Sequence, residues 1–262
     1  MKILETIKQQ KKKEVEERKS LYPIKLLEKS IYFETQCVSL KSYISNEKYS
    51  GIIAEFKRKS PSKGNINLYA DAEKVTLGYM QAGASALSVL TDETFFGAKK
   101  QDLLMARKLN YCPILRKDFI IDEYQIVESK AMGADTILLI AKMLSPTIIN
   151  QFTDFAHLLG MEVLLETHTE TEILENINTT ADLVGINNRN LNTFEVDIEN
   201  SIRLAEMLPK TIVKIAESGI ESAGVIKELK NNGFSGFLIG EYFMRDSDPA
   251  TKCAELIKEL KE

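Results

Sequence analysis

The sequence predicts an α/β fold, a (β/α)8 TIM barrel with an N-terminal helical extension. After about residue 50, short apolar runs rich in β-branched residues alternate with longer amphipathic stretches. Their near-continuous apolar character is typical of parallel strands that helices cover. Eight such runs occur, each separated by enough chain for one helix and two loops. They are residues 51–56, 86–90, 113–117, 136–140, 162–166, 183–187, 212–216 and 236–239.

Residues 1–50 precede the first strand and are expected to form one or two helices and a connection that contains Pro23. Apolar residues at positions 3, 4 and 7 have helical spacing, and the lysine run at 11–13 is expected to be a solvated helix face. So few residues would make a marginal core alone, so we expect an extension that packs on the barrel.

Eight βα units most simply close into a barrel, and 262 residues is a common length for one such domain. We therefore expect a single domain over residues 1–262. Glycines mark several helix-to-strand turns, at Gly83, Gly133, Gly160 and Gly233. An open doubly wound sheet is the structural alternative. No G-x-G-x-x-G follows any predicted strand, which counts against a dinucleotide-binding fold.

Composition excludes several classes of protein. A net charge of -4 with interspersed signs gives no indication of nucleic-acid binding. Cys37, Cys112 and Cys253 form no C-x-x-C, which argues against disulfides or zinc and fits a reducing cytoplasm. The 2 histidines argue against a histidine-rich metal site. No apolar run is long enough for a signal peptide or a membrane span. We expect a cytoplasmic protein, a monomer or weak homo-oligomer, without membrane or nucleic-acid partners.

Charged and polar residues recur where the predicted strands end. The carboxyl ends of the strands form the active-site face of such barrels. Ionisable groups at the end of a hydrophobic barrel are costly without partners, so a convergent ligand site explains them better than isolated ion pairs. The residues are Glu55, Lys57, Lys117, Glu166, Asn187, Arg189, Glu217 and Glu241.

Phosphate is the anion that the loops favour. The loops after the last two strands of these barrels often bind phosphate through backbone N–H groups. Ser218-Gly219 and Gly240 lie at those positions, and glycine lets the backbone approach the oxygens closely. Lys57 and Ser60 could complete the shell from the first strand.

The residues at the strand ends and in the phosphate loops, taken in order with their neighbours in the sequence, resemble those of the indole-3-glycerol-phosphate synthase family of tryptophan biosynthesis. The resemblance spans essentially the whole chain and implies a barrel enzyme without metal or organic cofactor. It implies ring closure, decarboxylation and dehydration of 1-(2-carboxyphenylamino)-1-deoxyribulose 5-phosphate to indole-3-glycerol phosphate. The matching segments are AEFK at 54–57, SPSKG at 60–64, SVLTD at 88–92 with Phe96, LRKDFI at 115–120, LLETH at 164–168, GINNRNL at 185–191, AESGI at 216–220 and LIGE at 238–241.

The resemblance also implies roles. Lys117 would be the principal general acid and Glu166 the second proton-transfer group, needed for loss of water. Lys57 would hold the substrate carboxylate, and Glu55 would position the lysines and a substrate hydroxyl. Asn187, Glu217 and Arg189 would complete the polar shell, Ser60, Ser218, Gly219 and Gly240 would bind phosphate, and Leu90, Phe96, Phe119, Leu138, Leu191 and Leu238 would wall the anthranilate ring.

Two further expectations concern proton affinity. A partly desolvated lysine close to other cations can have a lowered pKa. An apolar wall can raise the pKa of Glu166, whereas Lys57 or Lys117 nearby would lower it, and the sequence does not decide between the two effects. The chain also departs from the family pattern. It has no tryptophan to cover the substrate ring, so Ile3 or Leu4 would replace it, and the carboxylate of Glu241 is expected to point away from the phosphate.

Two alternatives stay open from the sequence. A phosphosugar isomerase such as phosphoribosylanthranilate isomerase would share the phosphate loops, but would not require Lys57, Lys117 and Glu166 together. A non-catalytic barrel that binds a phosphorylated metabolite would not require the acid–base residues.

Overall fold

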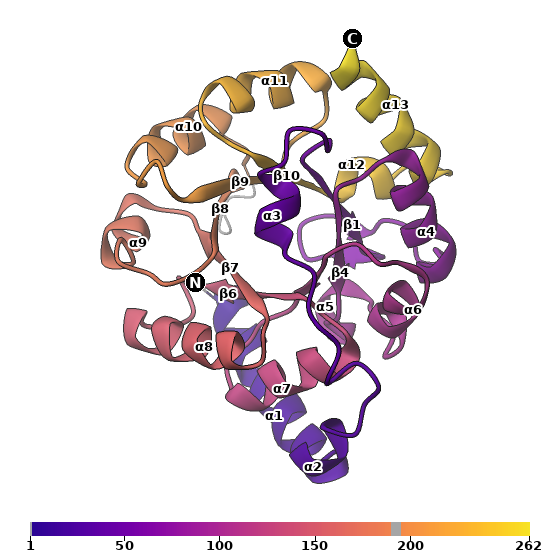
Figure 1. Ribbon diagram of the computed structural model, residues 1–262, viewed down its shortest axis with the longest axis vertical. Coiled ribbons are helices and arrows are strands. Elements are labelled where there is room, and N and C mark those ends of the chain that lie inside the picture. The colour runs from indigo at the N-terminus through magenta and orange to yellow at the C-terminus, as the bar shows by residue number, and fades with distance from the viewer. Residues whose placement is uncertain (1, 190–194) are drawn as a thin grey trace.

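Eight parallel strands close into a barrel, in the order β1-β10-β9-β8-β7-β6-β5-β4, with helices outside them (Figure 1). The structure is a computed structural model that describes residues 2–189 and 195–262. It confirms the predicted (β/α)8 barrel and excludes the open sheet. The barrel strands are β1 (Ile52–Phe56), β4 (Ala86–Leu90), β5 (Ile114–Lys117), β6 (Thr136–Ile140), β7 (Glu162–Thr167), β8 (Leu183–Asn187), β9 (Val213–Glu217) and β10 (Gly236–Ile239).

Helices follow the strands around the barrel, and a two-stranded hairpin of β2 (Lys59–Ser60) and β3 (Gly64–Asn65) follows β1. None of the helices within the described ranges has the length and apolar character to cross a membrane. The helices are α4 (Ala72–Ala82), α5 (Glu93–Phe96), α6 (Asp102–Leu109), α7 (Glu123–Met132), α8 (Pro146–Leu158), α9 (Glu170–Glu175), α10 (Ile198–Glu206), α11 (Ala223–Asn231), α12 (Glu241–Met244) and α13 (Pro249–Lys261).

The predicted strands differ from the observed ones only at their ends. Gly51 lies outside β1 because its φ of 77° is left-handed. Pro113 lies outside β5 and has no N–H to give to a ladder. Glu217, expected just past a strand, is its last residue and pairs in register with Asn187. The glycines predicted at helix-to-strand turns all have positive φ, as a left-handed helix end requires.

The N-terminal extension forms three helices, not the one or two expected: α1 (Lys2–Leu21), α2 (Ile24–Leu27) and α3 (Leu40–Ile44). Pro23, predicted in a connection, is the residue before α2. Leu40 and Ile44 are buried in the barrel interior, and α3 lies over the barrel opening in Figure 1. The first turns of α1 join the same core through Ile7 at the opposite, carboxyl end of the strands, so the extension contacts both ends of the barrel.

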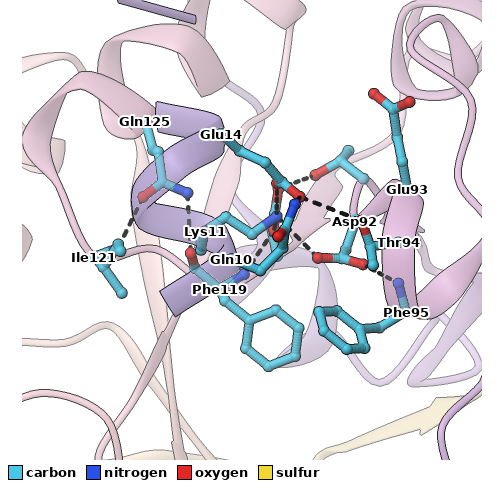
Figure 2. A network of polar contacts seen from close by, with 12 residues as sticks. Gln10, Lys11, Glu14, Asp92, Glu93, Thr94, Phe95, Phe119, Ile121 and Gln125 are labelled. Carbon is cyan, nitrogen blue, oxygen red and sulfur yellow. Dashed lines mark hydrogen bonds and ion pairs between the residues drawn. The ribbon is translucent and has the colours of Figure 1, made fainter. Parts of the chain in front are cut away.

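The prediction that residues 11–13 form a solvated face is wrong for Lys11, which is only 1% exposed. Its Nζ lies 2.9 Å from Asp92 and 2.9 Å from Asp118, and 2.8 Å from Glu14 on the same helix. Figure 2 shows the side chain reaching from α1 towards Asp92. Burial disfavours the ionised Asp118, but Lys11 and Arg116 outweigh it and hold its pKa well below the usual range. Buried ion pairs thus fix α1 to the ends of β4 and β5.

Candidate active site

A cavity lies at the carboxyl ends of the strands and brings the predicted site residues together. Leu191, predicted to wall the ring, lies outside the described residues. The predicted residues that line the cavity are Glu55, Lys57, Ser60, Leu90, Phe96, Lys117, Phe119, Leu138, Glu166, Asn187, Arg189, Glu217, Ser218, Gly219, Leu238 and Gly240. Lining residues to which the sequence assigned no role include Ile140, Glu221 and Tyr242. Pro61, Ser62, Asp118, Ile220 and Ile239, which belong to the motif segments, also line it.

Four ionisable side chains of the cavity come from alternate barrel strands: Glu55 from β1, Lys117 from β5, Glu166 from β7 and Glu217 from β9. Alternate strands of a closed barrel point side chains inward at the same height, which forms a layer of four. Two of the intervening strands carry small residues beside them, since Ser88 of β4 pairs in register with Glu55 and Gly185 of β8 with Glu166.

The missing side chains make room for the carboxylates. A Cβ on Gly185 would lie 2.2 Å from Oε1 of Glu217, and a Cβ on Gly240 would lie 2.5 Å from Oε1 of Glu55. Gly240 was singled out for phosphate, but its lack of a side chain is also required by Glu55. The hydroxyl of Ser88 donates to Oε2 of Glu55 over 3.3 Å.

Lys117 is the centre of the charged layer. Its Nζ donates to Oε2 of Glu166 over 2.6 Å and to Oε2 of Glu217 over 2.9 Å. Nζ of Lys57 donates to Oε1 of Glu55 over 2.7 Å. Asn187 Nδ2 donates to Oε1 of Glu166 over 3.3 Å. A proton donor and two carboxylates therefore meet within hydrogen-bonding distance.

The expected lowering of the Lys117 pKa is wrong. Burial opposes its charge, but Glu166, Glu217 and Glu55 outweigh burial and raise its pKa above the ordinary value. For Glu166 the sequence leaves open which of two opposing effects prevails; burial favours the neutral carboxyl, but Lys117 and His168 outweigh burial and lower its pKa to about 2. Burial and the charge of Glu166 instead raise the pKa of Glu217 to about 7, against the pull of Lys117. The carboxyl that holds a proton near neutrality is thus Glu217.

The loop after β9 has an unusual backbone. Ser218, with a φ of 71°, is the one residue other than glycine with positive φ among the described residues, and Gly219 follows with a φ of 70°. Such strain in a non-glycine residue often accompanies a binding function. Asn188 Nδ2 donates to the carbonyl of Ser218 over 2.6 Å and holds the turn. A Cβ on Gly219 would lie 2.2 Å from Val196, so a side chain there would change the loop itself.

Glu241 differs from the expectation that its carboxylate points away. It lines the cavity, and its Oε2 accepts from Arg189 over 3.0 Å. Nζ of Lys63, in the loop after β1, lies 3.6 Å from its Oε1. Glu241 thus lies between two cations at the edge of the cavity.

An apolar wall faces the charged layer. The rings of Phe96 and Phe119 are 6.0 Å apart and inclined by 42°. Ile3, Leu4 and Ile7 of α1 extend this wall, so the helix supplies part of the cavity. The expectation that an aliphatic residue of the first helix takes the place of tryptophan is in keeping with their positions.

Sequence reasoning missed His168, whose buried ring lies behind Glu166. It follows Glu166 by two positions, and strand alternation brings such residues to one side. The two-residue spacing from Glu166 is the sequence signal that could have identified His168.

The fold is that of a barrel enzyme, and its cavity holds a lysine between two carboxylates, an arrangement suited to proton transfer. A family model described as "Indole-3-glycerol phosphate synthase" matches residues 4–256. The chain belongs to the indole-3-glycerol phosphate synthase family.

Curated relatives carry that name over their full length. The protein of Bacteroides thetaiotaomicron is 47% identical over 258 residues, which cover 98% of each chain. That of Campylobacter jejuni strain 81-176 is 40% identical over 250 residues, which cover 94% of this chain and 96% of the relative.

Solved structures share the fold at low identity. Thiamine phosphate pyrophosphorylase from Pyrococcus furiosus has a TM-score of 0.61 at 16% identity, over 85% of this chain and 98% of that one. A structure of the tryptophan synthase a2b2 complex from the same organism has a TM-score of 0.58 at 14% identity, over 81% of this chain and 98% of that one.

Proposed function

We propose that the protein converts 1-(2-carboxyphenylamino)-1-deoxyribulose 5-phosphate into indole-3-glycerol phosphate, carbon dioxide and water, in tryptophan biosynthesis. The observation that carries the proposal is Lys117 held between Glu166 and Glu217 in a cavity with an aromatic wall. The curated relatives named above support this reaction over the isomerase alternative.

Ring closure requires a proton at the substrate carbonyl, because its carbon becomes electrophilic only when the oxygen gains a donor. Lys117 keeps its proton between two carboxylates and is the donor in this step. Lys57 binds the substrate carboxylate, and Glu55 holds Lys57 in place through their 2.7 Å ion pair.

The later steps need both carboxyl groups. Loss of carbon dioxide restores the aromatic ring without a further proton. Loss of water then needs one proton at the departing hydroxyl and the removal of one from the neighbouring carbon. Glu166, ionised and held by Asn187, serves this dehydration together with the protonated Glu217. With the substrate carboxylate ionised, each turnover takes up one proton.

The phosphate and the aromatic ring bind at separate parts of the cavity. Ser60, Ser218, Gly219 and Gly240 bind the phosphate, with Arg189 in support, and the strained backbone at Ser218 favours this assignment. The anthranilate ring packs on the apolar wall of Leu90, Phe96, Phe119, Leu138 and Leu238, and on the aliphatic residues of α1.

We infer further that residues 1–262 act as one unit in the cytoplasm, as a monomer or weak homo-oligomer, with no cofactor. The ion pairs of Lys11 with Asp92 and Asp118 support the single unit, since they join the extension to the barrel. Three free cysteines fit a reducing compartment.

Incubation with the carboxyphenylamino ribulose phosphate tests the proposal. Indole absorbance should rise with one equivalent of carbon dioxide, and the K117A variant should give neither. Isomerisation of phosphoribosylanthranilate without indole formation would support the isomerase instead, and no turnover of either compound would support a binding protein.

A further inference from the structure

Glu166 and Glu217 share Lys117 but differ in their remaining contacts. Both carboxylates are buried, and the Oε2 atom of each contacts Nζ of Lys117. Oε1 of Glu166 lies 3.3 Å from Asn187 Nδ2 and 3.3 Å from Nε2 of His168. Oε1 of Glu217 has no hydrogen-bond partner within the described residues. The pair is therefore unequal because of what lies behind Glu166.

His168 lies on the side of Glu166 away from the cavity. Its side chain is 6% exposed and is not among the residues that line the cavity. Nδ1 lies 3.6 Å from Oε2 of Glu172 on α9, and the backbone N–H of His168 donates to the same oxygen over 2.7 Å. The imidazole thus lies between two carboxylates at ion-pair distance, and neither ring nitrogen makes a hydrogen bond within the described residues.

We propose that His168 is a positioning residue that keeps Glu166 ionised. When the two carboxyl groups together carry one proton, that proton is then on Glu217. His168 does not touch the substrate and acts through the charge and position of Glu166. The proposal deepens the proposed function by assigning the base and the acid of one step to particular side chains. The charge distribution itself exists without substrate, so it can be tested even if the reaction is a different one.

The other groups around the two carboxylates account for only part of the difference. Lys117 contacts both carboxylates at similar distances, and the negative charge of Glu55 on β1 adds to the raised pKa of Glu217. Asn187 is uncharged and contacts Glu166 on its other side. The remaining charges near His168 are Glu172 and, close to it, Lys142. The His168 ring is a contact that Glu166 has and Glu217 lacks, and it is among the causes that lower the pKa of Glu166.

The chemical consequence is a fixed direction of proton transfer. An ionised Glu166 can accept a proton from carbon, and a protonated Glu217 can donate one to the departing hydroxyl, so the proton total of the pair is unchanged by the step. If the proton were distributed between the two carboxyl groups, part of the enzyme would carry it on Glu166. In that part Glu166 could not accept a proton from carbon, and Glu217 could not donate one.

The decisive variant is H168Q, which keeps a polar side chain of similar length but cannot carry a charge. Infrared spectra of the unliganded protein would follow the C=O band of protonated carboxyl groups against pH, with E166Q used to assign the band of Glu166. An opposite charge at this distance lowers the pKa of a carboxyl group by about 1 pH unit or more. The Glu166 band should therefore appear at higher pH in H168Q than in the parent, by about that amount.

Kinetics give a second readout. A raised pKa of Glu166 in H168Q should move the acid limb of the kcat profile to higher pH by about 1 pH unit, and H168K, which retains a cation, should move it back. H157Q is the matched control, since His157 pairs with Asp182 at an exposed site and should leave both readouts unchanged. An unshifted Glu166 band in a folded H168Q protein, or a uniform loss of kcat without a shift of the limb, would overturn the proposal.

Discussion

Replacement of Gly185 by alanine should disable the site without unfolding the barrel. The added Cβ would lie 2.2 Å from Oε1 of Glu217 and 3.3 Å from its Cδ. Real Cβ atoms do not approach other heavy atoms closer than 3.0 Å, so the carboxylate has to move by roughly 1 Å. Its other oxygen is held by Lys117 at 2.9 Å, so the movement disturbs that contact.

The expected loss follows from that displacement. A misplacement of about 1 Å in a catalytic group costs on the order of 10²-fold in rate, or about 2.7 kcal/mol in activation free energy. The fold should persist, because alanine in a strand costs less conformational entropy than glycine and Gly185 has no positive φ. Steady-state kcat/KM and the thermal midpoint would be measured side by side.

Two companion variants sharpen the test. G224A is the matched control, because a Cβ there meets only Ser222 Oγ at 3.8 Å and should leave kcat/KM unchanged. Its thermal midpoint should rise slightly, since alanine in α11 loses less conformational entropy than glycine. In G185A/E217D the shorter carboxylate should recover part of the lost rate. A G185A protein with kcat within a few-fold of the parent would refute the argument that Glu217 needs the space at Gly185.

Four other outcomes are expected. K117A should lose about 10²–10⁴ in kcat with an unchanged circular dichroism spectrum, and retention of a tenth of the parent rate would contradict its role as acid. In single-turnover experiments, E166Q should release carbon dioxide faster than it forms indole, with a hydroxylated intermediate between them; strictly parallel release would place Glu166 in ring closure instead. Glu217 should make the folded protein less stable as pH rises from its ordinary carboxyl range through about 7, because its folded-state pKa is raised, and urea unfolding of E217Q should lack that dependence. K11M should lower the free energy of unfolding by about 3–5 kcal/mol, since it removes the lysine from buried Asp92 and leaves Asp118 with Arg116 as its cation. K12M at an exposed position should change it by less than about 0.5 kcal/mol.

The sequence predicts the barrel and the four charged strand ends because both depend on local pattern. A parallel strand that is covered on both faces must be apolar, so Glu55, Lys117, Glu166 and Glu217 stand out where each run ends. Once the strands close, alternate-strand geometry brings those four together without further information.

The features that were missed depend on pairs far apart in the chain. Lys11 is one of three consecutive lysines, and only the arrival of Asp92 and Asp118 in space separates it from its neighbours. The sign of the Lys117 pKa shift depends in the same way on which charges lie nearest. Sequence places it beside Lys57, whereas in the structure its direct contacts are Glu166 and Glu217.

The anchoring of α1 also orders events during synthesis. The ribosome releases this helix, with its apolar residues Ile3, Leu4 and Ile7, long before Asp92 and Asp118 have been made. The nascent helix therefore has no docking partner until β4 and β5 emerge, and its apolar side stays accessible to chaperones in the interval. The α1 part of the cavity wall is therefore synthesised before the strands that it packs on, and it takes its place only after they have formed.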